Sequence, residues 1–304
     1  MTHGATRSVR VRVPATSANL GPGFDAVGLA LSLYDEAVIT LRPDAAVVVD
    51  IDGLGSDWLP RGEEHLMLRS LRSAADRFGL LVGGVEIRAH NAIPQGRGLG
   101  SSAATITAGV AAAWMLVPGH DGLDPAAVLA VAAALEGHPD NVAACVYGGL
   151  TISWVGADCA CAAALQVHPG IRAELFLPSL ELPTASARGL LPATVPHPEA
   201  AFNAGRSALL THALTTAPDL LLEATEDRLH QPYRAAAMPE STALLEDLRH
   251  AGIAAVISGA GPSVLALTST RSGAEAAQTI VLPPGWTRHR LAVSDGVEAL
   301  VVQA

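Results

Sequence analysis

A short glycine-rich segment in the first half of the chain has the residue types that bind phosphate. Residues 98–104 (GLGSSAA) lead into an alanine-rich stretch, residues 101–116, that favours a helix. A glycine loop that enters a helix start presents unpaired backbone N–H groups and the positive end of the helix dipole, and both suit an anion. Ser101 and Ser102 add hydroxyl groups, one of which could bind Mg²⁺. The segment therefore predicts a phosphate site.

Two other interpretations of this segment stay open. It also fits the dinucleotide-binding pattern G-x-G-x-x-A, but that fingerprint requires a buried strand running directly into the first glycine. Here Pro94, Gln95, Gly96 and Arg97 intervene, which argues against the dinucleotide hypothesis. The other alternative is a structural loop that binds no ligand.

A second segment, residues 136–141 (EGHPDN), concentrates ionisable and polar side chains at the end of a predicted helix. Glu136, His138, Asp140 and Asn141 suit a cation or a polar substrate better than a protein core, because such groups are seldom buried without partners. A solvated helix terminus is the alternative interpretation.

Two further glycine-bearing segments could close on a ligand. Residues 14–25 (PATSANLGPGFD) follow a predicted strand, and Asn19 and Asp25 could both project from a loop there. Residues 258–263 (SGAGPS) link two predicted strands, and their glycines permit a close backbone approach. A surface turn and a tight hairpin are the respective alternatives.

The composition excludes several mechanisms. The chain of 304 residues contains no lysine, and all 19 basic residues are arginine. P-loop NTPases and protein kinases need a lysine on the ATP phosphates, and Schiff-base chemistry needs a lysine amine.

The net charge of −10 argues against a nucleic-acid partner, and no apolar run has the roughly 18 residues of a membrane span. Three cysteines, an odd number, argue against a disulfide framework. We therefore expect a cytoplasmic protein without a nucleic-acid or membrane partner.

The predicted elements place the polar segments at the ends of strands and helices. Strands are expected at residues 9–13, 37–41, 47–51, 85–88, 151–155, 171–177, 253–258, 263–268 and 287–293. Helices are expected at residues 63–78, 101–116, 125–135, 199–213, 218–228, 241–250 and 273–280. The pattern changes after about residue 150, so we expect two domains, residues 1–160 and 161–304.

The order and content of these segments resemble the GHMP kinase superfamily (galacto-, homoserine, mevalonate and phosphomevalonate kinases). The loop P-x-x-x-G-L-G-S-S-A-A, here residues 94–104, is specific to that superfamily. Residues 14–25 and 136–141 resemble its homoserine branch, as do residues 184–188 (TASAR) and 231–234 (QPYR). The resemblance extends almost from end to end. Mevalonate kinases carry a lysine in the first motif, which this chain lacks.

The resemblance implies an α+β fold with two domains, the N-terminal one like domain 2 of ribosomal protein S5 and the C-terminal one ferredoxin-like. It also implies Mg²⁺-assisted transfer of phosphate from ATP to the side-chain hydroxyl of L-homoserine, a step in threonine biosynthesis, without a dedicated catalytic base. Homodimers are common among the proteins that this chain resembles. A kinase of another small alcohol and a non-catalytic ligand sensor are the alternatives, and the intact phosphate loop argues against the sensor.

The resemblance also implies the roles of individual residues. The ATP-binding loop comprises Pro94, Gln95, Gly96, Arg97, Gly98, Leu99, Gly100, Ser101, Ser102, Ala103 and Ala104, and the Mg²⁺ ligands are Ser102 and Glu136. The catalytic residues are Asn141, which orients the hydroxyl, Thr184 and Arg188. Substrate binding falls to Arg188 and Arg234 for the carboxylate, and to Asp25 for the ammonium, with Asn19, His138, Asp140 and the loop glycines Gly259 and Gly261. His65 stands where the family often has an asparagine, which leaves the adenine contacts open.

Overall fold

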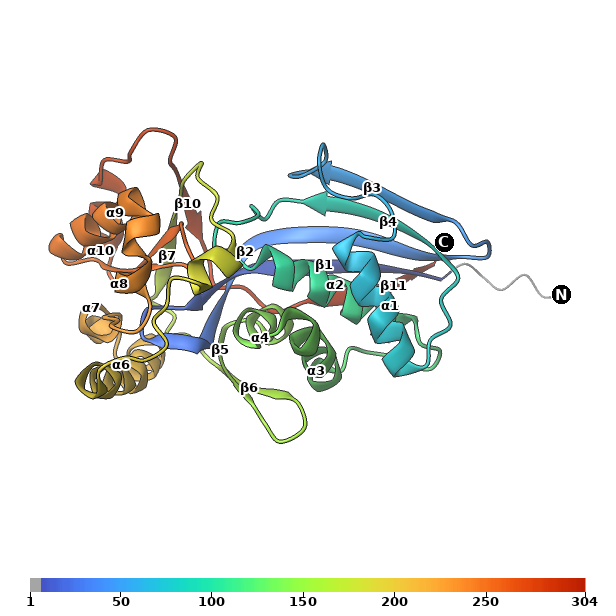
Figure 1. The fold of residues 1–304 in the computed structure, drawn as a ribbon, viewed down its shortest axis with the longest axis horizontal. Helices are drawn as coiled ribbons and strands as arrows, with labels where there is room; N and C mark the ends of the chain where they lie inside the picture. Colours follow the sequence, from blue (N-terminus) through green and yellow to red (C-terminus); the bar gives the residue numbers. More distant parts are fainter. Residues whose placement is uncertain (1–6, 304) are drawn as a thin grey trace.

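The computed structural model describes residues 7–303, and for Arg271, Ser272 and Gln303 it describes the backbone alone. Two antiparallel-rich sheets organise the chain, and helices cover each of them (Figure 1). The predicted α+β class is confirmed.

The larger sheet has seven strands and carries the N-terminal half of the chain. Its main path runs β11-β1-β2-β4-β3, with β5 paired to β2 and β6 paired to β5; only β3 and β4 pair in parallel. The strands are β1 (Arg7–Asn19), β2 (Gly23–Arg42), β3 (Val47–Gly53), β4 (Gly84–Asn91), β5 (Leu150–Val155), β6 (Ala160–Leu165) and β11 (Glu298–Gln303). Three helices contact the strands of this sheet: α2 (Ser101–Leu116), α3 (Pro125–Glu136) and α4 (Asp140–Tyr147). A fourth, α1 (Leu66–Phe78), packs against α2 and α3.

The smaller sheet has four strands in the order β10-β7-β9-β8. They are β7 (Arg172–Leu177), β8 (Ala254–Ile257), β9 (Val264–Thr268) and β10 (Thr287–Leu291). The helical elements of this half are α5 (Thr184–Arg188), α6 (His197–Thr215), η1 (Pro218–Leu220), α7 (Leu221–Ala224), α8 (Gln231–Arg234), η2 (Ala235–Ala237), α9 (Pro239–His250) and α10 (Arg271–Thr279).

Helix α2 is the central helix of the N-terminal half. It is apolar around its whole circumference, as expected for a helix enclosed by other elements, and it contacts α1, α3, α4 and β1. Small side chains permit this enclosure: a Cβ added at Gly109 would lie 2.4 Å from the carbonyl oxygen of Met67. The packing fixes α2 rigidly, so its N-terminus is a fixed point for the site.

The structure corrects the prediction of a loop over residues 14–25. Strand β1 continues to Asn19 and β2 begins at Gly23, so only a tight turn, residues 20–22, separates them. Pairing with β2 overrides the weak strand preference of the small polar residues 15–19.

Several other elements differ from the prediction. The predicted helix 218–228 ends at Ala224. Sequence patterns also missed six elements: α4, α5, α8, η2, β6 and β11. The boundary near residue 160 stays a prediction, and two strands that begin at or after it, β6 and β11, belong to the larger sheet.

Two further expectations concern membrane-spanning helices and the cysteines. Between residues 7 and 303, no helix combines the length and the apolar character that crossing a membrane requires. The three cysteines are free, as expected, and only Cys145 is buried.

Candidate active site

The predicted phosphate loop runs from the end of β4 to the start of α2. Gly96, Gly98 and Gly100 have φ values of +64°, +73° and +67°. Residues other than glycine rarely adopt this left-handed backbone conformation. A Cβ at Gly98 would lie 2.0 Å from the carbonyl oxygen of Ser258, and one at Gly100 would lie 2.0 Å from Thr16 Oγ1. The three glycine-bearing segments of the sequence therefore meet at this loop.

Three hydrogen bonds hold the loop in place. Ser258 Oγ donates to the carbonyl oxygen of Gly98 at 2.7 Å, the Thr16 N–H donates to that of Leu99 at 3.0 Å, and the Leu182 N–H donates to that of Gly96 at 2.8 Å. The first backbone bond of α2 joins the Ala104 N–H to the Gly100 carbonyl at 2.8 Å. The preceding N–H groups of α2 consequently have no partner within the helix, which suits them to an anion.

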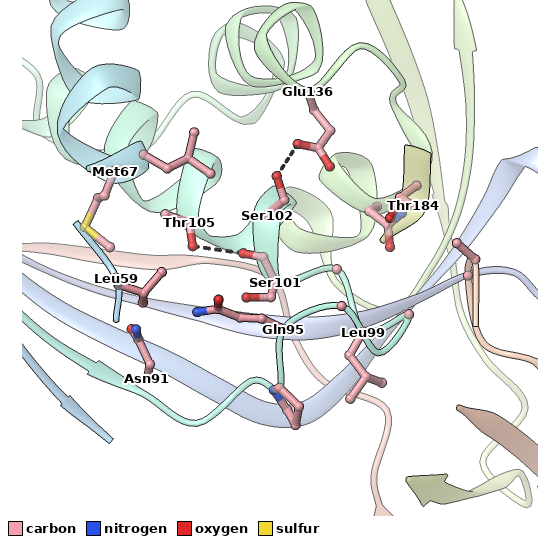
Figure 2. Close-up of a pocket in the computed structure, with 18 of the residues that line it drawn as sticks. Leu59, Met67, Asn91, Gln95, Leu99, Ser101, Ser102, Thr105, Glu136 and Thr184 are labelled. Carbon is pink, nitrogen blue, oxygen red and sulfur yellow. Dashed lines mark hydrogen bonds between the residues drawn. The ribbon is translucent and has the colours of Figure 1, made fainter. Parts of the chain in front are cut away.

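A cavity of about 350 Å³ opens in front of the loop. Its polar end is formed by the loop, Glu136 and Thr184, and Figure 2 shows Ser101 and Ser102 at the helix start with Gln95 on the preceding loop. Its other end is more apolar and includes Leu59, Pro60, His65, Leu66 and Met67. An apolar end joined to a phosphate-binding end suits a nucleotide.

Ser102 and Glu136 both line this cavity and contact each other. Ser102 Oγ, in the first turn of α2, donates to Glu136 Oε2 at 2.8 Å, and Glu136 is the last residue of α3 (Figure 2). Burial raises the pKa of Glu136, and the bond from Ser102 only partly offsets this effect. A nearby cation would stabilise the ionised carboxylate.

The polar residues at the start of α4 form one hydrogen-bonded group. Asp140 is 3% exposed, and its Oδ1 lies 3.0 Å from His138 Nδ1 and accepts from the backbone N–H of Asn141 at 2.8 Å. Thr16 Oγ1 donates to Asn141 Oδ1 at 2.8 Å. The bond to Asp140 is the main reason that the pKa of His138 is raised. Asp140 orients its neighbours, whereas His138 and Asn141 line the cavity.

A second group lies at the turn between β1 and β2. Arg188 Nη1 and Nη2 donate to the two carboxylate oxygens of Asp25, each at 2.9 Å. Asn19 Oδ1 accepts from the Asp25 N–H at 2.9 Å, while Asn19 Nδ2 donates to the carbonyl oxygen of Gly259 at 2.9 Å. Asn19, Leu20 and Asp25 all have positive φ, and strained backbone of this kind gathers at functional sites.

Arg234 is buried behind this ion pair and is 2% exposed. Its guanidinium donates to three neutral acceptors: the carbonyl oxygens of Ala187 (3.2 Å) and Gly259 (3.4 Å), and His230 Nδ1 (3.1 Å). Within the described residues, no carboxylate lies within 4.0 Å of it, and burial is the main reason that its pKa is lowered. A buried cation without a contacting counter-ion is suited to an anionic ligand.

The structure gathers most of the predicted residues around the cavity, but not all. The lining includes Pro94, Gln95, Gly96, Gly98, Leu99, Gly100, Ser101, Ser102, Glu136, His138, Asn141, Thr184 and Gly259. The lining does not include Asn19, Asp25, Arg97, Ala103, Ala104, Asp140, Arg188 and Arg234. Ala103 and Ala104 are core residues, and Arg97 turns away to pair with Glu181 Oε1 at 3.3 Å.

Sequence reasoning missed three residues that support the site. Thr16 and Ser258 lie inside segments that were singled out for their glycines. Nothing in the sequence indicated that these two residues form hydrogen bonds with the loop and with Asn141. Asp35 lies in the interior of β2 and carried no sequence signal. Its Oδ1 accepts from the N–H groups of Ala92 and Ile93, at 2.7 and 2.8 Å, directly before the phosphate loop.

Comparison with known proteins agrees with this geometry. The family model described as GHMP kinases N terminal domain matches residues 65–149, and the GHMP kinases C terminal model matches residues 206–282. The chain therefore belongs to the GHMP kinases.

Its similar relatives define the branch within that family. A homoserine kinase from Streptomyces avermitilis is 55% identical over 287 residues, which cover 94% of this chain and 93% of the relative. A homoserine kinase from Leifsonia xyli subsp. xyli is 48% identical over 290 residues, covering 94% and 90%. The crystal structure of homoserine kinase from Cytophaga hutchinsonii superposes with a TM-score of 0.84 at 27% identity, covering 96% of this chain and 97% of that one. The resemblance to the homoserine branch is confirmed.

Proposed function

We propose that this chain transfers the γ-phosphoryl group of ATP to the side-chain hydroxyl of L-homoserine, giving ADP and O-phospho-L-homoserine. One structural relationship carries the proposal: the nucleotide-sized cavity adjoins a cluster of opposite charges suited to an amino acid. Helix α5 joins the two, because Thr184 at its start lines the cavity and Arg188 at its end bonds to Asp25. Gly259 joins them again, since it lines the cavity and its carbonyl accepts from Asn19 and Arg234.

The charged cluster is complementary to a zwitterion. An α-amino acid brings a carboxylate for the guanidinium groups of Arg188 and Arg234 and an ammonium for Asp25, and guanidinium matches carboxylate in two-point geometry. In the structure Arg188 and Asp25 satisfy each other instead. A bound zwitterion would replace that ion pair with two new ones, so charge balance is kept.

The phosphate end of the cavity fits Mg²⁺. Ser102 Oγ and Glu136 Oε2 are hard oxygen donors, and their separation of 2.8 Å is close to the roughly 3 Å between adjacent oxygens in an octahedron of 2.0–2.1 Å bonds. Mg²⁺ would neutralise phosphate charge there, and it would favour the ionised form of Glu136, whose pKa is raised by burial. Ser102 and Glu136 are therefore our proposed ligands.

Positioning, not proton abstraction, is the proposed source of rate. Asp140 is the carboxylate beside Asn141, but it is bound to His138 and to the Asn141 N–H and does not line the cavity. Asn141, fixed by Thr16, and Thr184 are left to orient the acceptor hydroxyl. Phosphoryl transfer permits this, because its loose transition state needs alignment and charge stabilisation more than a strong base. A homodimer and a cytoplasmic location stay predictions.

Identification of the product tests the proposal. The protein is incubated with ATP, Mg²⁺ and L-homoserine, and the phosphorylated product is identified by ³¹P NMR and mass spectrometry. We expect O-phospho-L-homoserine and ADP in equal amounts. Release of inorganic phosphate with unmodified homoserine would contradict the proposal.

A further inference from the structure

His230 lies in the C-terminal half, directly before α8 (Gln231–Arg234), and has so far appeared only as an acceptor for the Arg234 guanidinium. Its side chain is 0% exposed and touches two elements of the site. Nε2 lies 2.8 Å from the carbonyl oxygen of Gly21, in the turn between β1 and β2, and Nδ1 lies 3.1 Å from Arg234 Nη1. The imidazole also stacks on Phe24, with 5.1 Å between ring centroids.

These two contacts allow only one protonation state. A carbonyl oxygen only accepts, so Nε2 must carry a hydrogen; a guanidinium only donates, so Nδ1 must present a lone pair. The ring is therefore neutral, with its hydrogen on Nε2. A second proton on Nδ1 would point at a guanidinium N–H and remove an acceptor from a buried cation.

The charged groups around the ring favour this neutral state on balance. Asp227 Oδ2 lies 3.6 Å from Nε2, but it already accepts from the backbone N–H groups of His230 and Gln231 at 3.1 and 2.8 Å. Arg234 opposes a charge on the ring, and Asp25 favours one. Burial is the largest influence, and it lowers the pKa of His230.

We propose that His230 is a positioning residue for substrate recognition, which holds the Arg234 guanidinium and the Gly21 turn in one fixed arrangement. Because Asp25 lies four residues after Gly21, the ring links the proposed carboxylate ligand to the strand that carries the proposed ammonium ligand. The inference rests on the proposed function, since it assigns Arg234 to the homoserine carboxylate.

Two amide variants separate the two contacts of the ring. In His230→Asn the amide oxygen can take the place of Nδ1 and accept from Arg234, while in His230→Gln the amide nitrogen can take the place of Nε2 and donate to Gly21. We expect KM for homoserine to rise roughly 10-fold or more in His230→Gln. It should rise clearly less in His230→Asn, with KM for ATP within about twofold of wild type in both, because Arg234 does not line the nucleotide cavity.

A double-mutant cycle with Arg234→Met completes the kinetic test. In the Arg234→Met background, His230→Gln should raise KM for homoserine no further. Additive effects, or homoserine and ATP KM values that rise together as the melting temperature falls, would show a purely structural role and overturn the proposal. The proposed function is checked separately, because it fails if the wild-type protein does not phosphorylate homoserine at all.

A measurement on the wild-type protein covers the case in which both amide variants unfold. The ¹⁵N chemical shifts of the His230 ring should report a neutral imidazole with its hydrogen on Nε2 from pH 6 to 8. A protonated ring, or a hydrogen on Nδ1 in that range, would overturn the proposal without any variant.

Discussion

Ser102 Oγ lies 2.8 Å from Glu136 Oε2, which joins the first turn of α2 to the last residue of α3 across the mouth of the phosphate loop. The contact brings together residues 34 positions apart in the chain. It places two oxygen donors beside the free N–H groups of a helix start, which is where a metal-bound phosphate would be stabilised from both sides.

Glu136→Gln should separate activity from stability. The change removes a partly buried carboxylate whose pKa is raised, while the amide oxygen can still accept from Ser102. We expect the metal-free variant to melt no lower than wild type, because a partly buried charge has been removed. We also expect kcat/KM to fall by roughly 100-fold or more, since the proposed metal would lose a charged ligand. Thermal melts and Mg²⁺ titrations of activity measure both effects, and a variant with unchanged Mg²⁺ dependence would remove Glu136 from the metal site.

The Asp25–Arg188 pair should matter for substrate and little for folding. The two side chains are 35% and 43% exposed, and ion pairs of this kind contribute about 0–1 kcal/mol to stability. In Asp25→Asn we expect kcat/KM for homoserine to fall, by an amount that corresponds to about 2–5 kcal/mol of lost transition-state stabilisation. The loss should be smaller for 4-hydroxybutyrate, which has no ammonium group.

The Arg10–Glu36 pair of β1 and β2 is the matched control for this change. It is similarly exposed, at 58% and 36%, with 2.6 Å between Nη2 and Oε2, and neither residue lines the nucleotide cavity. Glu36→Gln should leave both substrates unaffected. Equal losses for homoserine and 4-hydroxybutyrate in Asp25→Asn would contradict the assignment of Asp25 to the ammonium.

Arg234→Ala should weaken catalysis beyond its effect on folding. We expect a loss of about 2–5 kcal/mol in transition-state stabilisation, because the substrate carboxylate would lose a buried partner. Arg249→Ala is the control. Arg249 is partly buried and, like Arg234, donates to backbone carbonyl oxygens, here those of Leu222 and Ala255, but it belongs to α9 and lies outside the cavity lining. Urea melts and steady-state kinetics on both variants decide the matter. The assignment of Arg234 to substrate binding would be contradicted if kcat/KM for homoserine fell no further in Arg234→Ala than in Arg249→Ala.

Gly98→Ala should damage the phosphate loop because the added Cβ would clash with a neighbouring backbone atom. Gly79, a glycine of similar backbone conformation in open space, is the matched control. Gly98 and Gly79 have nearly equal φ values, +73° and +70°, but an added Cβ meets the Ser258 carbonyl at 2.0 Å in one case and nothing within 4 Å in the other. Gly79→Ala should therefore cost about 1–2 kcal/mol of stability from its backbone conformation alone. Gly98→Ala should cost clearly more and raise KM for ATP. Equal losses in urea unfolding would show that the close approach is unimportant.

Asp35 should make folding stability depend on pH. Burial is the main reason that its pKa is raised, from 3.8 to about 6. A raised pKa means that the folded state holds this proton more tightly than the unfolded state, so the stabilisation is complete below about pH 4 and is lost as pH rises through 6. The loss amounts to roughly 3 kcal/mol at 1.36 kcal/mol per pKa unit.

Asp35→Asn cannot ionise and should lack this dependence. The variant should therefore gain stability relative to wild type between pH 4 and 7, as measured by urea unfolding at several pH values. A difference between the two proteins that stays constant over that range would show that Asp35 does not titrate as described.

The sequence predicted the phosphate end of the site well because its signals are local. The predicted helix 101–116 agrees with α2 at both ends, and three of the predicted loop glycines have positive φ. A loop with left-handed turns favours glycine, and an enclosed helix favours alanine. Both preferences involve residues that are close together in the sequence, so the loop and the helix could be predicted from that segment alone.

The amino-acid end could not be derived from local patterns. The Asp25–Arg188 bond spans 163 positions, and the five-residue helix α5 gives no periodicity to read. Arg188 entered only through the family resemblance, whereas Asp25 was visible in its glycine-bearing segment and received its role from the resemblance. Strand β11 was missed for a similar reason, because its partner β1 lies almost the whole chain away and only tertiary pairing reveals it.

The most direct test of the account compares acceptor alcohols in one ADP-release assay. L-Homoserine, 4-hydroxybutyrate, 3-aminopropan-1-ol, mevalonate and galactose are each supplied at several concentrations with ATP and Mg²⁺. We predict that kcat/KM is highest for L-homoserine, by roughly 100-fold or more over the two analogues that each lack one charge. Preferential turnover of mevalonate, galactose or an analogue with a single charge would contradict a site built around a zwitterion.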